Sequence, residues 1–333
     1  MKRKGGKKMQ NTLVLLPLDE EYRKRIMAAS QGKSDVVFYD SSWTRDEYIS
    51  ALQCADVLLG DPEPEDLNAC QNLRWMQTTW SGVRQYVTCE VFRQGAVLCN
   101  MTGAYGPAIA EHEMAMILAL CKRLPQYQNH QSRGLWKMAG FDKTLEESTV
   151  LILGAGDIGC ELAKRLRPFV KKIIGIRRRE REYPDYFDEM ITLNDLDQYL
   201  PLADVVSCSL PDTLETRHLL DKRRLHLMKK DAILINVGRG NLIVTEDLLE
   251  VLKEGMLWGV GLDVTDPEPL PQYHSLWKQP RVMITPHVSG NVHEQDSPSI
   301  CRILDFVVQN YEKYMQGKDY ENIVDIDVGY RKG

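Results

Sequence analysis

Three polar residues follow short apolar runs in the second half of the 333-residue sequence. Arg239 closes AILINVGR, Glu268 lies just past GLDVTDP, and His287 ends VMITPH. Polar residues at the carboxyl ends of neighbouring strands share one crevice in an open α/β sheet. An arginine binds a carboxylate through its planar fork and polarises an adjacent carbonyl, while a histidine gives a proton to the carbonyl oxygen. A carboxylate orients the imidazole, so the set predicts hydride transfer to a 2-keto acid.

Each of these residues also fits an ordinary structural role when taken alone. Arg239 fits a surface turn, Glu268 a solvated loop and His287 the end of a strand. His112 lies in an apolar stretch, 108–124, whose spacing predicts a long buried helix, and we interpret it as a packed or surface histidine. The catalytic hypothesis therefore depends on a cofactor site elsewhere in the chain.

That cofactor site is predicted at TVLILGAGDIG, residues 149–159. Four apolar residues run into Gly154, Gly156 and Gly159, and a helical pattern follows. A buried strand, a GxGxxG turn and a helix form the context in which this motif binds a dinucleotide. The glycines allow the turn, the approach of the pyrophosphate and close packing of the helix, whose N-terminus attracts phosphate.

Whether the cofactor ribose carries a 2′-phosphate is predicted from the residues that follow the next expected strand, 171–176. An NAD site carries an acidic residue about 20 residues after the glycines, where it accepts a hydrogen bond from the ribose 2′-OH. Here KKIIGI is followed by Arg177, Arg178 and Arg179, and no carboxylate appears before Glu180. The arginines predict NADPH as the cofactor, with NAD as the alternative cofactor. If they bind no ligand, they form a solvated basic turn.

The rest of the chain supplies the scaffold for these residues. Short apolar runs alternate with helical or polar stretches in both halves, which predicts an α/β fold with parallel sheets. The runs are continuous rather than alternating, so we expect strands that are buried on both faces. At this length we expect about two domains.

Composition and charge exclude several classes of function. Net charge is −5 and charged residues make up 27%, so we expect no nucleic acid or membrane partner. The eight cysteines show no CxxC pair, which predicts a reduced, cytoplasmic location, and no metal site is expected. The first eight residues include five basic ones without a following apolar stretch, which predicts a solvated tail.

The chain resembles the D-isomer-specific 2-hydroxyacid dehydrogenase family over nearly its whole length. The matching stretches are AEH at 110–112, GAGDIG at 154–159, SLPDTLETRHLL at 209–220, INVGRG at 235–240, GLDVTDPEPLP at 261–271 and TPHVSG at 285–290. The resemblance implies two doubly wound domains. Residues 102–287 would form the NAD(P)-binding Rossmann domain, and residues 1–101 and 288–333 a discontinuous, flavodoxin-like substrate-binding domain. It also implies a homodimer.

The resemblance also implies the roles of individual residues. Arg239, Glu268 and His287 fall on the family's catalytic arginine, glutamate and histidine, and Asp263 on the position that contacts the nicotinamide carboxamide. Ser81 and Gly82 match the loop whose N–H groups bind the substrate carboxylate. Further cofactor contacts are implied at Gly154, Gly156, Asp157, Ile158, Gly159, Arg177, Arg178, Leu210, Pro211, Thr216, Val237, Gly238 and Gly290.

Two departures from the family pattern and the C-terminal tail bear on the substrate. The family usually has GVD where this chain has Gly82, Val83 and Arg84, and Arg177 replaces its acidic ribose-binding residue. The tail at 321–330 resembles the glyoxylate/hydroxypyruvate reductase branch, which predicts reduction of glyoxylate or hydroxypyruvate. Two alternatives remain. One is a phosphoglycerate dehydrogenase without a regulatory domain, with Arg84 and Arg133 near the phosphate. The other is a cofactor-sensing scaffold of the corepressor type.

Overall fold

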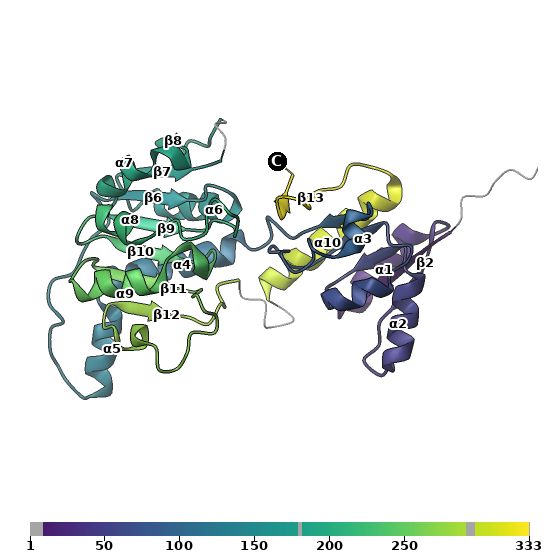
Figure 1. Cartoon of the computed structure of the whole chain (residues 1–333), viewed down its shortest axis with the longest axis horizontal. Coiled ribbons are helices and arrows are strands. Elements are labelled where there is room, and N and C mark those ends of the chain that lie inside the picture. The colour runs from purple at the N-terminus through teal and green to yellow at the C-terminus, as the bar shows by residue number, and fades with distance from the viewer. Residues whose placement is uncertain (1–8, 179–181, 291–296, 333) are drawn as a thin grey trace, which may run out of the picture. The chain divides into compact units, whose positions relative to one another are not determined.

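The computed structural model of the chain describes residues 9–178, 182–290 and 297–332. The chain divides into two compact units, of which unit 1 is Met1–Ala104 with Gln295–Gly333 and unit 2 is Tyr105–Glu294 (Figure 1). Each unit is built on a parallel sheet with helices, which confirms the expected α/β fold with two doubly wound sheets. The basic residues 1–8 and Arg179 lie outside the described residues.

Unit 2 carries a seven-stranded sheet in the order β12-β11-β10-β9-β6-β7-β8. All of its strands are parallel, and the order reverses between β6 and β9, where a doubly wound sheet opens its crevice. The strands are β6 (Thr149–Leu153), β7 (Lys172–Ile176), β8 (Glu189–Ile191), β9 (Val205–Cys208), β10 (Ile233–Asn236), β11 (Gly259–Leu262) and β12 (Val282–Ile284).

Two cores cover the two faces of this sheet. Along β6, Val150 and Ile152 pack into the core that includes α4 and α6, whereas Leu151 and Leu153 pack into the opposite core. Successive side chains of a strand point to opposite faces, so an all-apolar strand satisfies both layers. The first core lies under α4 (Gly106–Cys121) and α6 (Asp157–Leu166), and the second under α7 (Leu196–Tyr199), α8 (Lys222–Leu227) and α9 (Thr245–Lys253).

The long helix expected at 108–124 is α4 (Gly106–Cys121), which ends three residues earlier than expected. α4 ends at Cys121, and α5 (Leu124–Ser132) begins after Arg123, whose φ of +54° breaks the helical path. The short 3₁₀ segments of unit 2 are η2 (Leu193–Asp195), η3 (Leu200–Leu202), η4 (Gly240–Leu242) and η5 (Ser275–Lys278).

Unit 1 carries a five-stranded parallel sheet in the order β2-β1-β3-β4-β5. The strands are β1 (Gln10–Val14), β2 (Ser34–Phe38), β3 (Val57–Leu59), β4 (Trp75–Gln77) and β5 (Val97–Cys99). The helices are α1 (Glu20–Ser30), α2 (Arg45–Cys54), η1 (Pro64–Ala69), α3 (Glu90–Arg93) and α10 (Pro298–Gln316), and a small hairpin pairs β13 (Val324–Asp325) with β14 (Tyr330–Arg331).

The C-terminal helix α10 returns to the N-terminal strands and completes unit 1. It packs along α1, and the Tyr311 hydroxyl lies 2.9 Å from Thr12 Oγ1 and 2.6 Å from Ser30 Oγ. Tyr314 stacks on Trp75 of β4 with ring centroids 4.7 Å apart. The discontinuous unit is therefore held by buried hydrogen bonds as well as by apolar packing.

Candidate active site

The glycine turn between β6 and α6 shows why each glycine is needed. Gly154 has a φ of +109°, and a Cβ there would come within 3.0 Å of the carbonyl carbon of Ser209. A Cβ on Gly159 would lie 2.2 Å from the Gly154 carbonyl oxygen, so a side chain would push α6 away from β6. At exposed Gly156 a Cβ would meet no atom within 4 Å. The turn is closed on the protein side and open where phosphates would approach.

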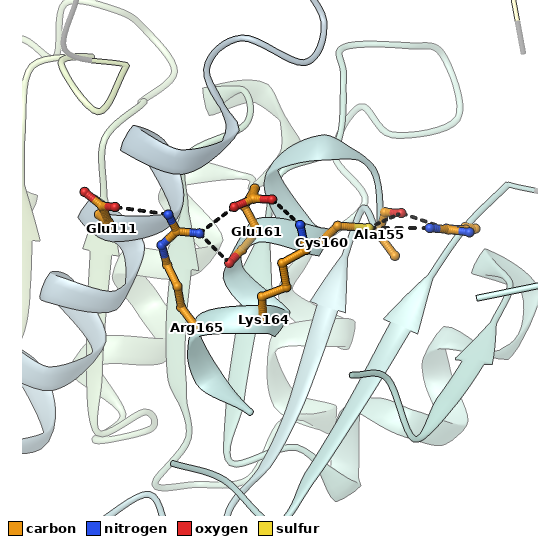
Figure 2. A network of polar contacts seen from close by, with 7 residues as sticks. Glu111, Ala155, Cys160, Glu161, Lys164 and Arg165 are labelled. Atoms are coloured by element: carbon orange, nitrogen blue, oxygen red, sulfur yellow. Dashed lines mark hydrogen bonds and ion pairs between the residues drawn. The ribbon is translucent and has the colours of Figure 1, made fainter. Parts of the chain in front are cut away.

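Helix α6, which the turn leads into, is anchored to α4. Its first residues, Asp157 and Ile158, belong to the turn whose N–H groups have no intrahelical acceptor. Arg165 bridges the helices, with 3.0 Å to Glu111 of α4 and 2.6 Å to Glu161 of α6 (Figure 2). The N-terminus of α6 therefore belongs to a helix that is fixed in place, as a phosphate site requires.

Arg177 folds back onto the glycine turn. Its Nε donates to the Ala155 carbonyl at 2.7 Å, and Nη2 lies 3.5 Å from Cys160 Sγ in the first turns of α6. Figure 2 shows Ala155 and Cys160 together at this edge of the turn. Arg178 is exposed, and within the described residues no carboxylate forms an ion pair with Arg177. The Arg177 guanidinium thus stands beside the predicted phosphate site, with no acidic partner among the described residues.

The loops after β9 and β10 meet the glycine turn at the point where the strand order reverses. Ser209 Oγ donates to the Gly154 carbonyl at 3.1 Å, and a Cβ on Gly238 would lie 2.7 Å from the Leu210 carbonyl oxygen. Thr216 Oγ1 donates to the Pro211 carbonyl at 2.6 Å and folds the β9 loop on itself. The predicted cofactor residues at these strand ends are thereby brought together: Leu210, Pro211, Thr216, Val237 and Gly238.

Arg239 follows β10 and is half-buried. Its Nη1 donates to the Gly238 carbonyl at 2.7 Å, and no carboxylate oxygen of the described residues lies within ion-pair distance. Burial lowers the pKa of the guanidinium, against the raising effect of the nearby Glu268 charge. Because an arginine in a protein stays protonated, this is a partly desolvated cation ready to take an anionic ligand.

Glu268 and His287 form the hydrogen-bonded pair that the sequence predicted. His287 Nδ1 lies 2.6 Å from Glu268 Oε1, and both side chains remain accessible, at 46% and 41%. The carboxylate can only accept, so we assign the Nδ1 proton to this bond, which leaves Nε2 to exchange a proton with a ligand. His287 has a left-handed φ of +54°, a conformation that costs a non-glycine residue about 1–3 kcal/mol.

Asp263, at the end of β11, holds the loop that follows β12. Its carboxylate is buried and accepts from Thr285 Oγ1 at 2.6 Å and from the N–H groups of Val288 and Ser289 at 3.0 Å each. Burial alone would raise the pKa of this carboxyl, but the bonds from Ser289, Thr285 and the backbone hold it below its ordinary value. His287 N also donates to the Asp263 carbonyl at 2.8 Å.

His112 has a partner that the sequence reasoning did not foresee. It lies on α4 with its side chain 24% exposed, and Nε2 is 3.0 Å from Thr285 Oγ1 and 3.8 Å from Asp263 Oδ1. The sequence analysis expected a packed or surface histidine and did not predict this hydrogen bond to Thr285. Its placement one residue from an apolar helix face was the signal available. Gly290, in the loop that follows β12, lies against the ring of Tyr105, and a Cβ on Gly290 would come within 3.1 Å of that ring.

In unit 1, Ser81 and Gly82 follow β4 in a well-anchored loop. Asn100 Nδ2 donates to the Ser81 carbonyl at 2.8 Å, and Ser81 Oγ donates to the Met101 carbonyl at 3.1 Å. Asp61 accepts from the Thr79 N–H at 2.9 Å. Across the described residues, no group accepts a hydrogen bond from the N–H groups of Ser81 and Gly82. Two fixed donors are thus available to an anion.

Other classes of site are not seen in the described part of the chain. There, no group of three or more histidine, cysteine or acidic side chains could hold a metal ion. No helix within 9–178, 182–290 and 297–332 is long and apolar enough to cross a membrane. All eight cysteines are described, and all are free.

Comparisons with known proteins agree with this geometry. The model of the D-isomer specific 2-hydroxyacid dehydrogenase NAD binding domain matches residues 114–289. The glyoxylate reductase of Thermofilum pendens is 33% identical over 77% of this chain and 79% of its own length. The mouse glyoxylate reductase/hydroxypyruvate reductase is 34% identical over 67% of this chain and 69% of its own. A D-isomer specific 2-hydroxyacid dehydrogenase family protein from Aeromonas salmonicida superposes with a TM-score of 0.80 at 32% identity, covering 96% of this chain and 100% of the other.

Proposed function

The chain belongs to the D-isomer specific 2-hydroxyacid dehydrogenase family and is an NAD(P)-dependent oxidoreductase, and from this premise we propose that it reduces glyoxylate or hydroxypyruvate to the D-2-hydroxy acid with NADPH. Relatives named as glyoxylate or hydroxypyruvate reductases support a small keto acid as the substrate. The observation that carries the proposal is the 2.6 Å bond between His287 and Glu268 beside Arg239. Among the described residues, Arg239 has no ion-pair partner.

Three side chains divide the work of the reaction. The chemistry that a nicotinamide nucleotide would supply, when bound, is a hydride with its two electrons for the keto carbon. Arg239 binds the substrate carboxylate and polarises the carbonyl. His287 gives its Nε2 proton to the carbonyl oxygen, and Glu268 holds the ring through Nδ1 as that proton leaves. The resemblance to the family supports a carboxylate-binding role for the N–H groups of Ser81 and Gly82 in unit 1, and among the described residues no group accepts a hydrogen bond from either N–H.

NADPH rather than NADH is proposed as the cofactor because of Arg177. Its guanidinium is held at the glycine turn by Ala155 and has no carboxylate partner in the described residues. An acidic residue at this place would repel a 2′-phosphate, whereas an arginine can form charge-assisted hydrogen bonds to it. Arg178, which is exposed, is the second proposed contact.

The test of the function is oxidation of NADPH with a panel of keto acids: glyoxylate, hydroxypyruvate, pyruvate, phosphohydroxypyruvate and bulkier analogues. His287→Ala sets the background. His226→Ala is the matched control, because His226 forms a pair of the same length, 2.6 Å to Glu254, on α8. We expect turnover of glyoxylate or hydroxypyruvate by the unmodified protein and the control only. Absence of turnover with every keto acid would refute the proposal.

The same panel decides the two alternative functions. A phosphoglycerate dehydrogenase would prefer phosphohydroxypyruvate, with Arg84 of unit 1 or Arg133 at the end of α5 as the phosphate partner. A cofactor-sensing scaffold would bind NADPH but show no turnover above the His287→Ala background. Either result would replace the proposed reductase activity.

We also propose that the protein is a homodimer in a reducing, cytoplasmic compartment. The segment after α5 exposes large apolar side chains, with Trp136 at 105%, Met138 at 77% and Phe141 at 89%. Monomers rarely leave such clusters in water, so a second copy is the proposed cover. Sedimentation of a Trp136→Ser, Phe141→Ser variant should show a monomer, and an unchanged dimer would exclude this surface. The eight free cysteines support the compartment.

A further inference from the structure

His112 on α4 is joined to the catalytic loop by two consecutive hydrogen bonds. Its Nε2 lies 3.0 Å from Thr285 Oγ1, which in turn lies 2.6 Å from Asp263 Oδ1. All of these residues belong to unit 2. We infer that His112 is a positioning residue, which acts through Thr285 and Asp263 to fix the loop that carries His287. The kinetic part of this inference rests on the proposed function.

The direction of the two bonds follows from the number of protons available. Asp263, as a carboxylate, can only accept, and the Thr285 hydroxyl has one proton to give. At 2.6 Å that proton belongs to the bond with Asp263. Thr285 Oγ1 must then accept from His112 Nε2–H. The structure therefore requires His112 to carry its proton on Nε2, and such a chain of hydrogen bonds strengthens each of its members.

Asp263 links this hydrogen-bonded series to the backbone around His287. Its side chain is 0% exposed, so its charge must be balanced by donors rather than by water. Besides Thr285, it holds the N–H groups of Val288 and Ser289, the two residues that follow His287. Asp263 also accepts His287 N–H through its own backbone carbonyl, at 2.8 Å. Rotation of this carboxylate would therefore displace the backbone on the C-terminal side of His287.

A purely packing role for His112 predicts different behaviour. If the ring only filled space on α4, any side chain of similar volume would replace it. If Nε2–H is the group that matters, only a side chain that places a donor at that position will serve. Glutamine places its amide nitrogen near the position of Nε2, whereas asparagine places it near Nδ1. The pair of variants separates the two roles while keeping a polar side chain.

The first experiment measures kcat for NADPH-dependent reduction of the best keto acid. His112→Ala and His112→Asn should lower kcat by up to about tenfold, the upper end of the cost of losing a hydrogen bond between neutral groups. His112→Gln should stay within about threefold of the unmodified enzyme, because it retains the donor. His226→Asn serves as the matched control on α8 and should leave kcat unchanged. Equal rates for the Gln and Asn variants would overturn the inference.

A double-mutant cycle tests the path through Thr285. Thr285→Val removes the hydroxyl and keeps the shape of the side chain, so it breaks the series of hydrogen bonds between His112 and Asp263. In that background His112→Ala should change kcat by less than about twofold, because coupled residues are not additive. Independent multiplication of the two losses would refute the connection.

A measurement without substrate separates this inference from the proposed function. The ¹⁵N spectrum of the imidazoles, with His112 assigned by its absence in His112→Gln, reports which ring nitrogen carries the proton. In the spectrum of the neutral imidazole we expect the Nε2–H form for His112, because Thr285 Oγ1 accepts from that nitrogen. An Nδ1–H form would overturn the chain of bonds. If the tautomer is as expected but no keto acid is reduced, the proposed function fails and the hydrogen-bond network stands.

Discussion

Glu113 on α4 is a fully buried acid whose ionisation should be visible in the stability of the protein. Its side chain is 0% exposed, the Ser207 hydroxyl donates to Oε1, and Oε2 has no partner in the described residues. Burial raises the pKa of the Glu113 carboxyl from 4.5 to about 8, and the bond from Ser207 opposes that rise. In the neutral range the folded protein keeps this proton, whereas the unfolded chain releases it.

The sign and size of the effect follow from that difference. A group whose pKa is higher in the folded state binds its proton more tightly there, so unfolding becomes easier as pH rises. The contribution of Glu113 is fully present below about pH 4.5, declines by ~1.4 kcal/mol per pH unit, and levels off above about pH 8, a total of ~5 kcal/mol.

The assay compares the pH dependence of the unfolding free energy in three proteins. Glu113→Gln keeps the shape of the side chain but cannot ionise, so it should lose this slope between about pH 5 and about pH 8. Glu111→Gln is the control, because Glu111 lies two residues earlier with its side chain 68% exposed. Urea unfolding gives the free energy, and hydrogen exchange of the α4 amides reports on unit 2 separately. Parallel curves for the unmodified protein and Glu113→Gln would refute the reasoning.

Four further substitutions test the site. His287→Ala should lose roughly 10²- to 10⁴-fold in kcat, the usual scale for general acid–base catalysis, and a fully active variant would exclude His287 as the proton donor. Arg239→Lys should raise KM for the keto acid and lower kcat, because lysine lacks the planar fork; an effect on cofactor affinity alone would point to a different arginine. Arg177→Asp should shrink or invert a preference for NADPH over NADH of at least about tenfold in kcat/KM, and equal values in the unmodified protein would reduce the arginine to solvated surface. Gly156→Val should fold with an unchanged Tm, since a Cβ there meets no atom within 4 Å, yet lose NADPH affinity in a titration; unchanged affinity would argue against a phosphate site at this turn.

The sequence alone was sufficient to predict those features that local chemistry determines. A strand buried on both faces needs continuous apolar residues, and the turn after β6 needs glycine where φ is +109° and where a Cβ would lie 2.2 Å from a carbonyl. Both requirements can be recognised in short stretches of sequence, so the parallel sheets and the glycine turn could be predicted. The candidate residues Arg239 and His287 were found because each lies three residues after the end of an apolar strand, β10 and β12 respectively. Their assigned roles, and the preference for NADPH, remain predictions.

Only the tertiary structure decided which of these residues meet. Glu268 and His287 are 19 positions apart, and His112 and Thr285 are 173 apart, so their contacts depend on the strand order and on how α4 packs against the sheet. The same packing buries Glu113, although its neighbours Glu111 and His112 reach solvent or polar partners. Hydrophobic periodicity predicted neither the contact of His112 with Thr285 nor the burial of Glu113, because a shift of one helical position moves a side chain by about 100° around the helix axis. The polar network around Asp263 is therefore a property of the assembled sheet and its covering helix, which no single stretch of sequence contains.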